Sequence, residues 1–160
     1  MKTEPWWEAA SYARRLSVLK KRAKIIETVR RFFTERDFLE VETPILQISP
    51  GLEPHLKAFR TGLTEPFGPS DRTMYLHTSP EFTMKKLLAV GLPRIFQMAR
   101  VFRNEERSDH HHPEFVMLEW YRAGEDYRAL MDDTVALVRA CAEACGVRKL
   151  KANGRECDPF

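Results

Sequence analysis

The segment RNEERSDHHHPEF, residues 103–115, sets three consecutive histidines beside Asp109, with three glutamates close by. Histidine and carboxylate groups can bind a metal ion, and arginine can bind phosphate through paired hydrogen bonds. Adjacent side chains in an extended loop point in alternate directions, so three histidines in a row rarely bind one ion. Metal binding, phosphate binding and a mobile loop whose histidines contact nothing are therefore the alternatives for this segment.

Two apolar runs flank this segment and predict the element that positions it. RIFQMARVFRNE (94–105) and EFVMLEWYRAG (114–124) both have strand character, and residues 107–113 join them as a loop. An antiparallel hairpin is the expected arrangement. Because every second side chain of a strand lies on the same face, we expect Phe96, Met98 and Phe102 to face the core.

The other face of the predicted hairpin carries side chains suited to a polar ligand: Gln97, Arg103, Glu105, Phe115, Glu119 and Tyr121. Arg103 can bind phosphate oxygens, and Phe115 can stack on a base. Glu119 can pair with an ammonium group, with a further hydrogen bond from Tyr121. The pattern predicts a site for a ligand with an anionic part and a flat ring. A solvent-facing sheet with chance ion pairs is the alternative.

Helices are expected on both sides of the strands. Apolar spacing predicts a long helix over 11–35, with one apolar face made of Leu16, Leu19, Ala23, Ile26 and Phe33. Its basic residues could contact RNA phosphate, but a solvated helix face is the preferred interpretation. A helix from Pro80 to Gly91 is expected after a cap at Thr78 or Ser79, with Glu81 in its first turn. A third, amphipathic helix should end at Gly146. Its expected apolar side is Leu130, Val135, Leu137, Val138 and Cys141.

Short strands complete the predicted elements. FLEVETPIL (38–46) suits a strand that Pro44 interrupts, and residues 74–77 suit another. The Pro- and Gly-rich residues 49–71 predict a long mobile loop with one short strand around 55–60.

Composition is that of a folded, soluble protein. The 160 residues are 43% hydrophobic, 31% charged and 11% aromatic, which predicts one domain and argues against disorder. The net charge of +3 is dispersed and is weak evidence for nucleic-acid binding. No apolar run approaches the ~20 residues that span a bilayer, and no secretion signal is apparent. We therefore expect a cytoplasmic protein, no membrane partner and three reduced cysteines.

Two segments resemble the class II aminoacyl-tRNA synthetases. FLEVETPIL resembles their motif 1, with Pro44 as its signature proline, and FRNEERSDHHHPEF resembles motif 2. Within the Asp/Asn/Lys subgroup, HTSPEFTMKKLL (77–88) and HPEFVMLEWYRAG (112–124) are most similar to the stand-alone lysyl-tRNA synthetase paralogues that attach a lysine to elongation factor P. The resemblance covers about residues 19–138.

The resemblance implies an α+β fold, namely a class II synthetase-like antiparallel sheet flanked by helices. Residues 1–160 would be the N-terminal part of the catalytic domain, with motif 1 at about 36–46 and motif 2 at about 100–121. Motif 3 is absent from the sequence, and no anticodon-binding OB domain precedes motif 1. We therefore expect no tRNA partner, and we doubt that this chain alone completes the reaction.

The implied reaction uses ATP and Mg²⁺ to activate lysine or R-β-lysine as an adenylate. The acyl group then passes to a lysine of elongation factor P. Arg103 would be the catalytic residue that stabilises charge on the phosphate. The ATP-binding residues would be Arg103, Asn104, Glu105, His111, His112 and Phe115, and the amino-acid-binding residues would be Ser79, Pro80, Glu81, Glu119 and Tyr121. The histidines would handle nucleotide rather than a protein-bound metal, and the chain would dimerise through motif 1.

Three departures from the family pattern bear on these expectations. Asp109 stands where arginine is usual, so ATP binding should be weaker unless Arg107 compensates. His112 replaces asparagine, which makes its hydrogen bond pH-dependent. Within motif 1, Asp37 stands where glycine is usual, so the local turn should differ. The alternatives are a catalytic-domain fragment that charges tRNA and a non-catalytic paralogue that binds elongation factor P or a full-length subunit.

Overall fold

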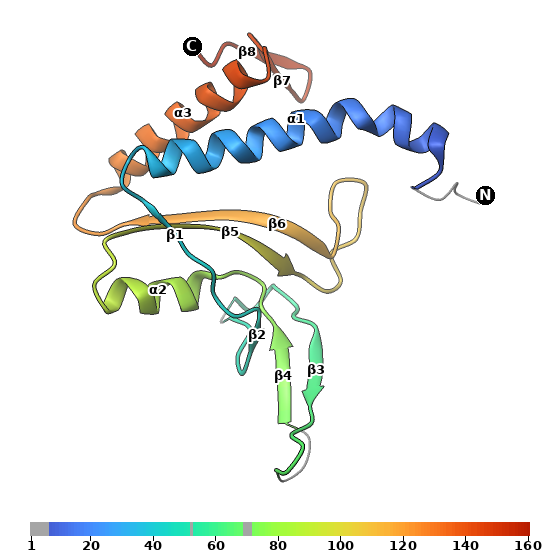
Figure 1. The fold of residues 1–160 in the computed structure, drawn as a ribbon, viewed down its shortest axis with the longest axis vertical. Coiled ribbons are helices and arrows are strands. Elements are labelled where there is room, and N and C mark those ends of the chain that lie inside the picture. The colour runs from blue at the N-terminus through green and yellow to red at the C-terminus, as the bar shows by residue number, and fades with distance from the viewer. Residues whose placement is uncertain (1–6, 52, 69–71) are drawn as a thin grey trace. The chain divides into compact units, whose positions relative to one another are not determined.

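The computed structural model describes residues 7–51, 53–68 and 72–160, which form two compact units (Figure 1). The first unit contains the described residues up to Asp37 together with Glu125–Phe160, and the second is Phe38–Gly124. All residues expected to bind ATP or an amino acid belong to the second unit. Among the described residues, no helix is long and apolar enough to cross a membrane.

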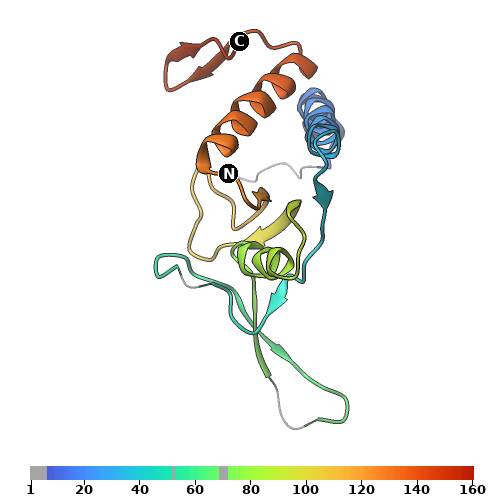
Figure 2. The same ribbon diagram turned by 90° about the vertical axis from the view of Figure 1, so that its left-hand side faces the viewer.

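The first unit is a helix pair followed by a small hairpin. Helix α1 (Ala9–Thr34) packs on α3 (Tyr127–Ala144), and β7 (Leu150–Ala152) pairs with β8 (Arg155–Cys157) (Figure 2). Both predicted helices are thus confirmed. Asp126 caps α3, because its carboxylate accepts a hydrogen bond of 2.9 Å from the backbone nitrogen of Arg128.

The predicted apolar faces of these two helices are wrong in part. The buried residues of α1 are Ser11, Thr28, Val29, Phe32 and Phe33, whereas Leu19 is exposed. On α3, Leu137 is buried, but Val135 and Val138 are exposed. Apolar spacing fixes a helix's period but not which neighbouring element covers each turn.

The main sheet of the second unit has the strand order β1-β5-β6. Strands β5 (Arg94–Phe102) and β6 (Glu114–Arg122) form the predicted antiparallel hairpin. Its register sets Gln97 opposite Glu119 and Val101 opposite Phe115. Strand β1 (Leu39–Glu40) pairs with β5 in parallel. The fold is therefore α+β with mainly antiparallel pairing.

A second sheet projects from the first as a narrow arm (Figures 1 and 2). It consists of β2 (Leu46–Gln47), β4 (Arg72–Leu76) and β3 (Arg60–Leu63), in the order β2-β4-β3. The single strand expected over 38–46 is thus two short strands, β1 and β2, which pair in different sheets on either side of Pro44. The strand expected around 55–60 was wrong, since β3 begins at Arg60, where it can pair with β4.

Helix α2 (Glu81–Ala89) covers one face of the main sheet (Figure 1). It begins one residue later than predicted, so Pro80 rather than the expected Thr78 or Ser79 is its N-cap residue. The Ser79 hydroxyl still accepts a 3.1 Å hydrogen bond from the nitrogen of Glu81 in the first turn. The core beneath the helix is Val41, Met84 and Ile95, with Leu87, Leu88, Leu92 and Tyr121 packed around it.

This packing corrects the predicted core side of the hairpin. Phe96 is buried as expected, but Met98 and Phe102 are only half-buried. The opposite face, which was predicted to be polar and open, includes the buried Ile95 and Gln97. The helix α2 lies over that face, so the polar side chains at its edge sit beside a core rather than on an open sheet.

The turn at the start of motif 1 adopts the conformation that glycine favours. Asp37 has φ +60°, in the left-handed region. Aspartate tolerates this region better than most residues, because its short side chain can bond locally. The substitution of aspartate for glycine has therefore kept a left-handed turn at this point.

Candidate active site

The candidate amino-acid site is a carboxylate cluster made of Ser79, Glu81, Lys85, Glu119 and Tyr121. The Ser79 hydroxyl, just before α2, donates a 2.9 Å hydrogen bond to Oε2 of Glu119 on β6. The Tyr121 hydroxyl donates to Oε1 of the same carboxylate. Two neutral hydroxyl groups therefore hold both oxygens of Glu119, and its negative charge has a fixed orientation.

A second layer of polar contacts ties this cluster to motif 1. Gln97 lies directly opposite Glu119 in the β5–β6 register and is only 5% exposed. The Thr43 hydroxyl donates a 2.9 Å hydrogen bond to the Gln97 side-chain oxygen. A buried amide without a partner would cost free energy, so this bond fixes how the motif 1 segment meets β5.

The ionisation of the cluster follows from burial and from its own charges. Burial raises the pKa of Tyr121, and the hydrogen bond with Glu119 raises it further. The hydroxyl thus stays protonated and remains a donor at neutral pH. Lys85 contacts Glu81, with Nζ 2.5 Å from Oε1, and this hydrogen bond and charge raise the pKa of the lysine.

The candidate nucleotide site centres on Arg103 and Phe115. The guanidinium carbon of Arg103 lies 5.3 Å from the centre of the Phe115 ring. The Nε of Arg103 donates to the carbonyl oxygen of Thr78 at 3.4 Å, and its backbone nitrogen bonds to the Pro113 carbonyl at 2.9 Å. The two terminal nitrogens of Arg103 make no hydrogen bond within the described residues. They are the groups that would bind phosphate oxygens.

Thr78 joins the two candidate sites. It precedes Ser79 of the carboxylate cluster, and its carbonyl oxygen accepts the hydrogen bond from Arg103. Its hydroxyl donates to the Pro50 carbonyl at 3.2 Å, and the side chain is buried. One residue thus links the start of α2, the motif 2 arginine and the loop that follows β2.

The remaining predicted ATP-binding residues lie on exposed loop backbone. Asn104 bonds through its nitrogen to the Lys57 carbonyl at 2.6 Å, and its side-chain oxygen accepts a 3.0 Å bond from the nitrogen of Glu105. Glu105 has φ +65°, an uncommon conformation for glutamate that costs free energy unless its surroundings hold it.

The histidines bond within their own loop. Nδ1 of His111 lies 2.9 Å from the Ser108 hydroxyl. Nδ1 of His112 lies 2.9 Å from the carbonyl oxygen of Glu114 and 3.2 Å from its nitrogen. Both residues are exposed. Within the described residues, no group of three His, Cys, Asp or Glu side chains is arranged to hold a metal ion.

The sequence matches the family model for tRNA synthetases class II (D, K and N) over residues 7–157. The chain belongs to this family.

Several curated relatives of this synthetase chain share one name. This chain is 48% identical over 136 residues to the elongation factor P–(R)-beta-lysine ligase of Histophilus somni (strain 2336), and the match covers 85% of this chain and 41% of that protein. The protein of the same name from Mannheimia succiniciproducens is 46% identical over 144 residues, covering 88% and 43% respectively. The one from Vibrio cholerae is 45% identical over 139 residues, covering 87% and 42%. The chain thus spans about two fifths of the length of these relatives.

The candidate residues of this synthetase therefore divide into three groups. Ser79, Glu81, Glu119 and Tyr121 come together in the carboxylate cluster, and Arg103 lies beside Phe115. Asn104, Glu105, His111 and His112 lie on the exposed loop. Pro80 is buried at the start of α2, where its carbonyl accepts a bond from the nitrogen of Met84 at 2.9 Å. Any influence of Pro80 on a ligand passes through the placement of Ser79 and Glu81.

Three residues around these sites are not among those predicted to bind a ligand: Thr43, Thr78 and Lys85. The contact of Lys85 with Glu81 had a local signal, because the two residues are four apart on a predicted helix. The bond from Thr43 to Gln97 spans 54 residues and had no such signal.

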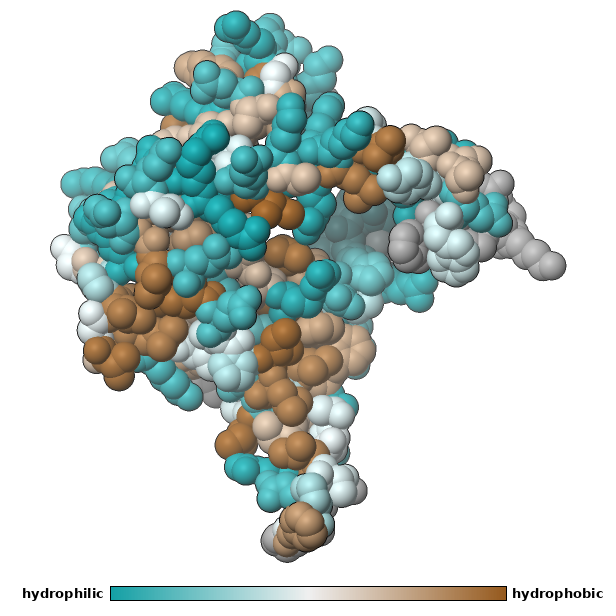
Figure 3. All heavy atoms as spheres, in the orientation of Figure 1, coloured by the Kyte–Doolittle hydropathy of each residue, from teal (hydrophilic) through white to brown (hydrophobic). Residues whose placement is uncertain are grey.

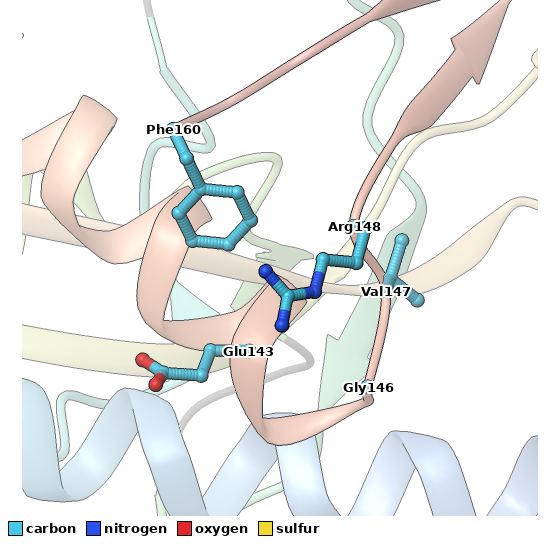
Figure 4. Close-up of a pocket in the computed structure, with 5 residues that line it drawn as sticks. All are labelled: Glu143, Gly146, Val147, Arg148 and Phe160. Atoms are coloured by element: carbon cyan, nitrogen blue, oxygen red, sulfur yellow. The ribbon is translucent and has the colours of Figure 1, made fainter.

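A separate hollow in the first unit contains none of the predicted synthetase site residues. It has a volume of about 450 Å³ and is lined by Glu143, Gly146, Val147, Arg148 and Phe160. Figure 4 shows the Phe160 ring beside the Arg148 guanidinium in this view, with the Glu143 carboxylate pointing away from Arg148. In the second unit, apolar surface gathers over α2 and around β2 (Figure 3). Its exposed residues include Ile45, Leu46, Ile48 and Phe82.

Proposed function

We propose that this chain supplies the amino-acid-binding and motif 2 part of a ligase that modifies elongation factor P. The carboxylate of lysine or R-β-lysine attacks the α-phosphate of ATP, and pyrophosphate leaves. The ε-amine of a lysine on elongation factor P then attacks the acyl carbon of the adenylate. An amide bond forms and AMP leaves.

The observation that carries this proposal is the pair of carboxylates at the carboxylate cluster. A lysine-type amino acid has two ammonium groups, and the cluster holds two glutamates. The Ser79 hydroxyl donates to the Glu119 carboxylate and accepts from the backbone nitrogen of Glu81. Glu81 would bind the amino group beside the reacting carboxylate, and Glu119 would bind the distant ammonium. The Tyr121 hydroxyl supports this role, because it stays protonated and keeps Glu119 oriented.

The contacts of Arg103 support ATP as the second substrate. Its Nε bonds to Thr78 and leaves the two terminal nitrogens to donate to the phosphate oxygens, where charge develops during attack. Phe115 would stack on adenine, with Asn104, Glu105, His111 and His112 nearby on the loop. Mg²⁺ would be bound through the ATP phosphates, which is its usual mode with nucleotides.

Elongation factor P is preferred over tRNA as the acceptor because the compared relatives are named for that reaction. The chain would act in the cytoplasm as a homodimer. The discriminating assay offers both acceptors, each with radiolabelled lysine or β-lysine. Label on elongation factor P supports the proposal, whereas label on tRNA alone contradicts it.

The first test is amino-acid-dependent ATP–pyrophosphate exchange by the chain, alone and with the downstream part found in its relatives. We expect exchange with lysine or β-lysine. If the chain alone is inactive, the longer form should be active. Arg103→Ala should reduce the rate by a factor of about 10² to 10³, as expected when a preorganised charge-stabilising donor is lost.

The matched control for this test is Arg100→Ala. Arg100 lies on β5 between the buried residues Ala99 and Val101, and its side chain is exposed on the opposite face of the strand. There it forms an ion pair with Glu114 at 3.3 Å. Its loss removes the same charge three residues earlier in the chain and should leave exchange nearly unchanged. An equal loss in both variants would contradict a specific role of Arg103 in stabilising phosphate charge. No exchange by either length of the wild type would indicate a non-catalytic paralogue.

A further inference from the structure

Lys85 belongs to the carboxylate cluster, but the proposed reaction gives this lysine no role. It lies one helical turn after Glu81 on α2, and its Nζ is 2.5 Å from Oε1 of Glu81. A pair with this spacing is common on helix surfaces. Its position is unusual, because Glu81 is also the carboxylate assigned to the amino group of the ligand.

A second observation connects Lys85 to the far side of the cluster. The hydrogen bond and charge of Glu81 raise the pKa of Lys85, and the charge of Glu119, on β6, raises it further. Ser79 bridges the two glutamates, since it donates to Glu119 and accepts from the nitrogen of Glu81. Lys85 is therefore a cation held within the field of both carboxylates.

We propose that Lys85 is an internal cation that occupies the Glu81 carboxylate and competes there with the ammonium group of an incoming ligand. This inference rests on the proposed function, which assigns Glu81 to that group. Lys85 is in this sense a specificity residue. It acts by changing the charge that the ligand must supply.

Charge counting shows what Lys85 selects. Two glutamates and one lysine give the cluster a net charge of −1, with Ser79 and Tyr121 neutral. A zwitterionic lysine or β-lysine has a net charge of +1 and matches it. A diamine that lacks a carboxylate has a charge of +2 and is penalised by the resident ammonium. Lys85 thus favours amino acids over their decarboxylated products.

Lys85 can be displaced reversibly from Glu81 because both side chains are partly exposed to solvent. Its side chain is 54% exposed and that of Glu81 is 34% exposed. The ammonium can therefore leave the Glu81 carboxylate on its flexible stem when a ligand arrives, while its charge stays on α2 beside the cluster. Exposed ion pairs contribute little to stability, so displacement should reduce ligand affinity only about twofold to fivefold.

The test is calorimetric titration of the chain without ATP, so that binding is measured apart from chemistry. The ligands are lysine, the diamine cadaverine and norleucine, which has a net charge of zero. Lys85→Met removes the ammonium but keeps the length and helix propensity of the side chain. We expect lysine to bind about twofold to fivefold more tightly, cadaverine to gain more than lysine, and norleucine to gain least.

Two further variants make the result specific. Lys86→Met removes the same charge one position along α2, where the side chain lines a different hollow with Gln47 and Phe82, and should change none of the affinities. Glu81→Gln removes the carboxylate for which the two cations compete. In that background, Lys85→Met should no longer tighten lysine binding. Thermal unfolding of each variant confirms that the chain is folded.

The outcomes separate the inference from the function on which it rests. Weaker lysine binding by Lys85→Met would mean that Lys85 orients Glu81, and unchanged binding would mean an ordinary surface pair. Either result overturns the inference while wild-type lysine binding supports the site. If neither the wild type nor Lys85→Met binds any of the amines, both the inference and the amino-acid site are wrong.

Discussion

At the scale of single residues, the chemistry of Glu119 is governed by neutral neighbours. Its two oxygens accept hydrogen bonds from Ser79 and Tyr121, and neither donor carries charge. The carboxylate is thereby oriented without being neutralised, so its charge remains available to a cation. A direct arginine partner at this position would have satisfied the same oxygens but cancelled the charge.

The ionisation of Tyr121 can be tested directly. Burial and the bond to Glu119 raise its pKa above the ordinary value of about 10 for a phenol. The raised pKa contributes stability that is fully present below pH ~10 and is lost as the pH rises through the folded-state value. We therefore expect the absorbance change at 295 nm near pH 10 to have the same amplitude in wild type and Tyr121→Phe.

The control for this titration is the unfolded chain. In denaturant, all four tyrosines of the wild type should titrate together, and Tyr121→Phe should lose the contribution of one. If the folded variant also lost that contribution near pH 10, Tyr121 would be an ordinary exposed phenol and its bond to Glu119 would not persist in solution.

At the scale of elements, motif 1 depends on the left-handed turn at Asp37 that precedes β1. A β-branched residue cannot adopt φ +60° without a clash, whereas glycine can. We expect Asp37→Val to lower the free energy of unfolding by about 1–2 kcal/mol and Asp37→Gly to leave it unchanged or raise it slightly. Urea unfolding followed by tryptophan fluorescence would measure both.

The stability of Asp37→Gly distinguishes the effect of the turn from that of the Asp37 carboxylate. If Asp37→Gly were as destabilising as Asp37→Val, the carboxylate of Asp37 would have to make a stabilising contact beyond the turn. The left-handed conformation would then not be the reason for the effect. Asp37→Asn separates the two, because asparagine tolerates the turn but lacks the charge.

Elements were predictable from sequence where the signal was local. The hairpin of β5 and β6, the helix after Ser79 and the long helix α1 follow from period, caps and turn residues. The split of motif 1 into β1 and β2 did not follow, because each half pairs with a strand far along the chain. The candidate site follows the same division. Glu119 and Tyr121 were found by alternation, but the bond from Ser79 to Glu119 spans 40 residues and only the fold reveals it.

At the scale of the whole molecule, the surface near motif 1 predicts association. Leu39 and Ile48 are 54% and 62% exposed, and Ile48 borders a hollow of about 320 Å³ with Gln47 and Phe82. Contiguous exposed apolar surface is typical of an interface. We expect the chain to be a dimer by light scattering and Ile48→Asp to shift it towards monomer.

Phe67→Asp is the matched control for the dimer prediction. Phe67 is fully exposed in the turn region after β3, away from motif 1, so the same change in polarity there should leave the mass unaltered. A wild-type chain that is monomeric at all concentrations, or a monomer produced equally by both substitutions, would contradict an interface at motif 1.

The division into two units also has a consequence for the order of synthesis. The second unit is one uninterrupted stretch, Phe38–Gly124. The first unit cannot form until Glu125–Phe160 has been made, because that segment contains α3, the helix on which α1 packs. Chains leave the ribosome at roughly 5–20 residues per second, and domains generally fold as units. The carboxylate cluster and Arg103 can therefore fold several seconds before α3 has been synthesised. During that time α1 has been made but has no α3 to pack on, whereas the site made after it already has its neighbours.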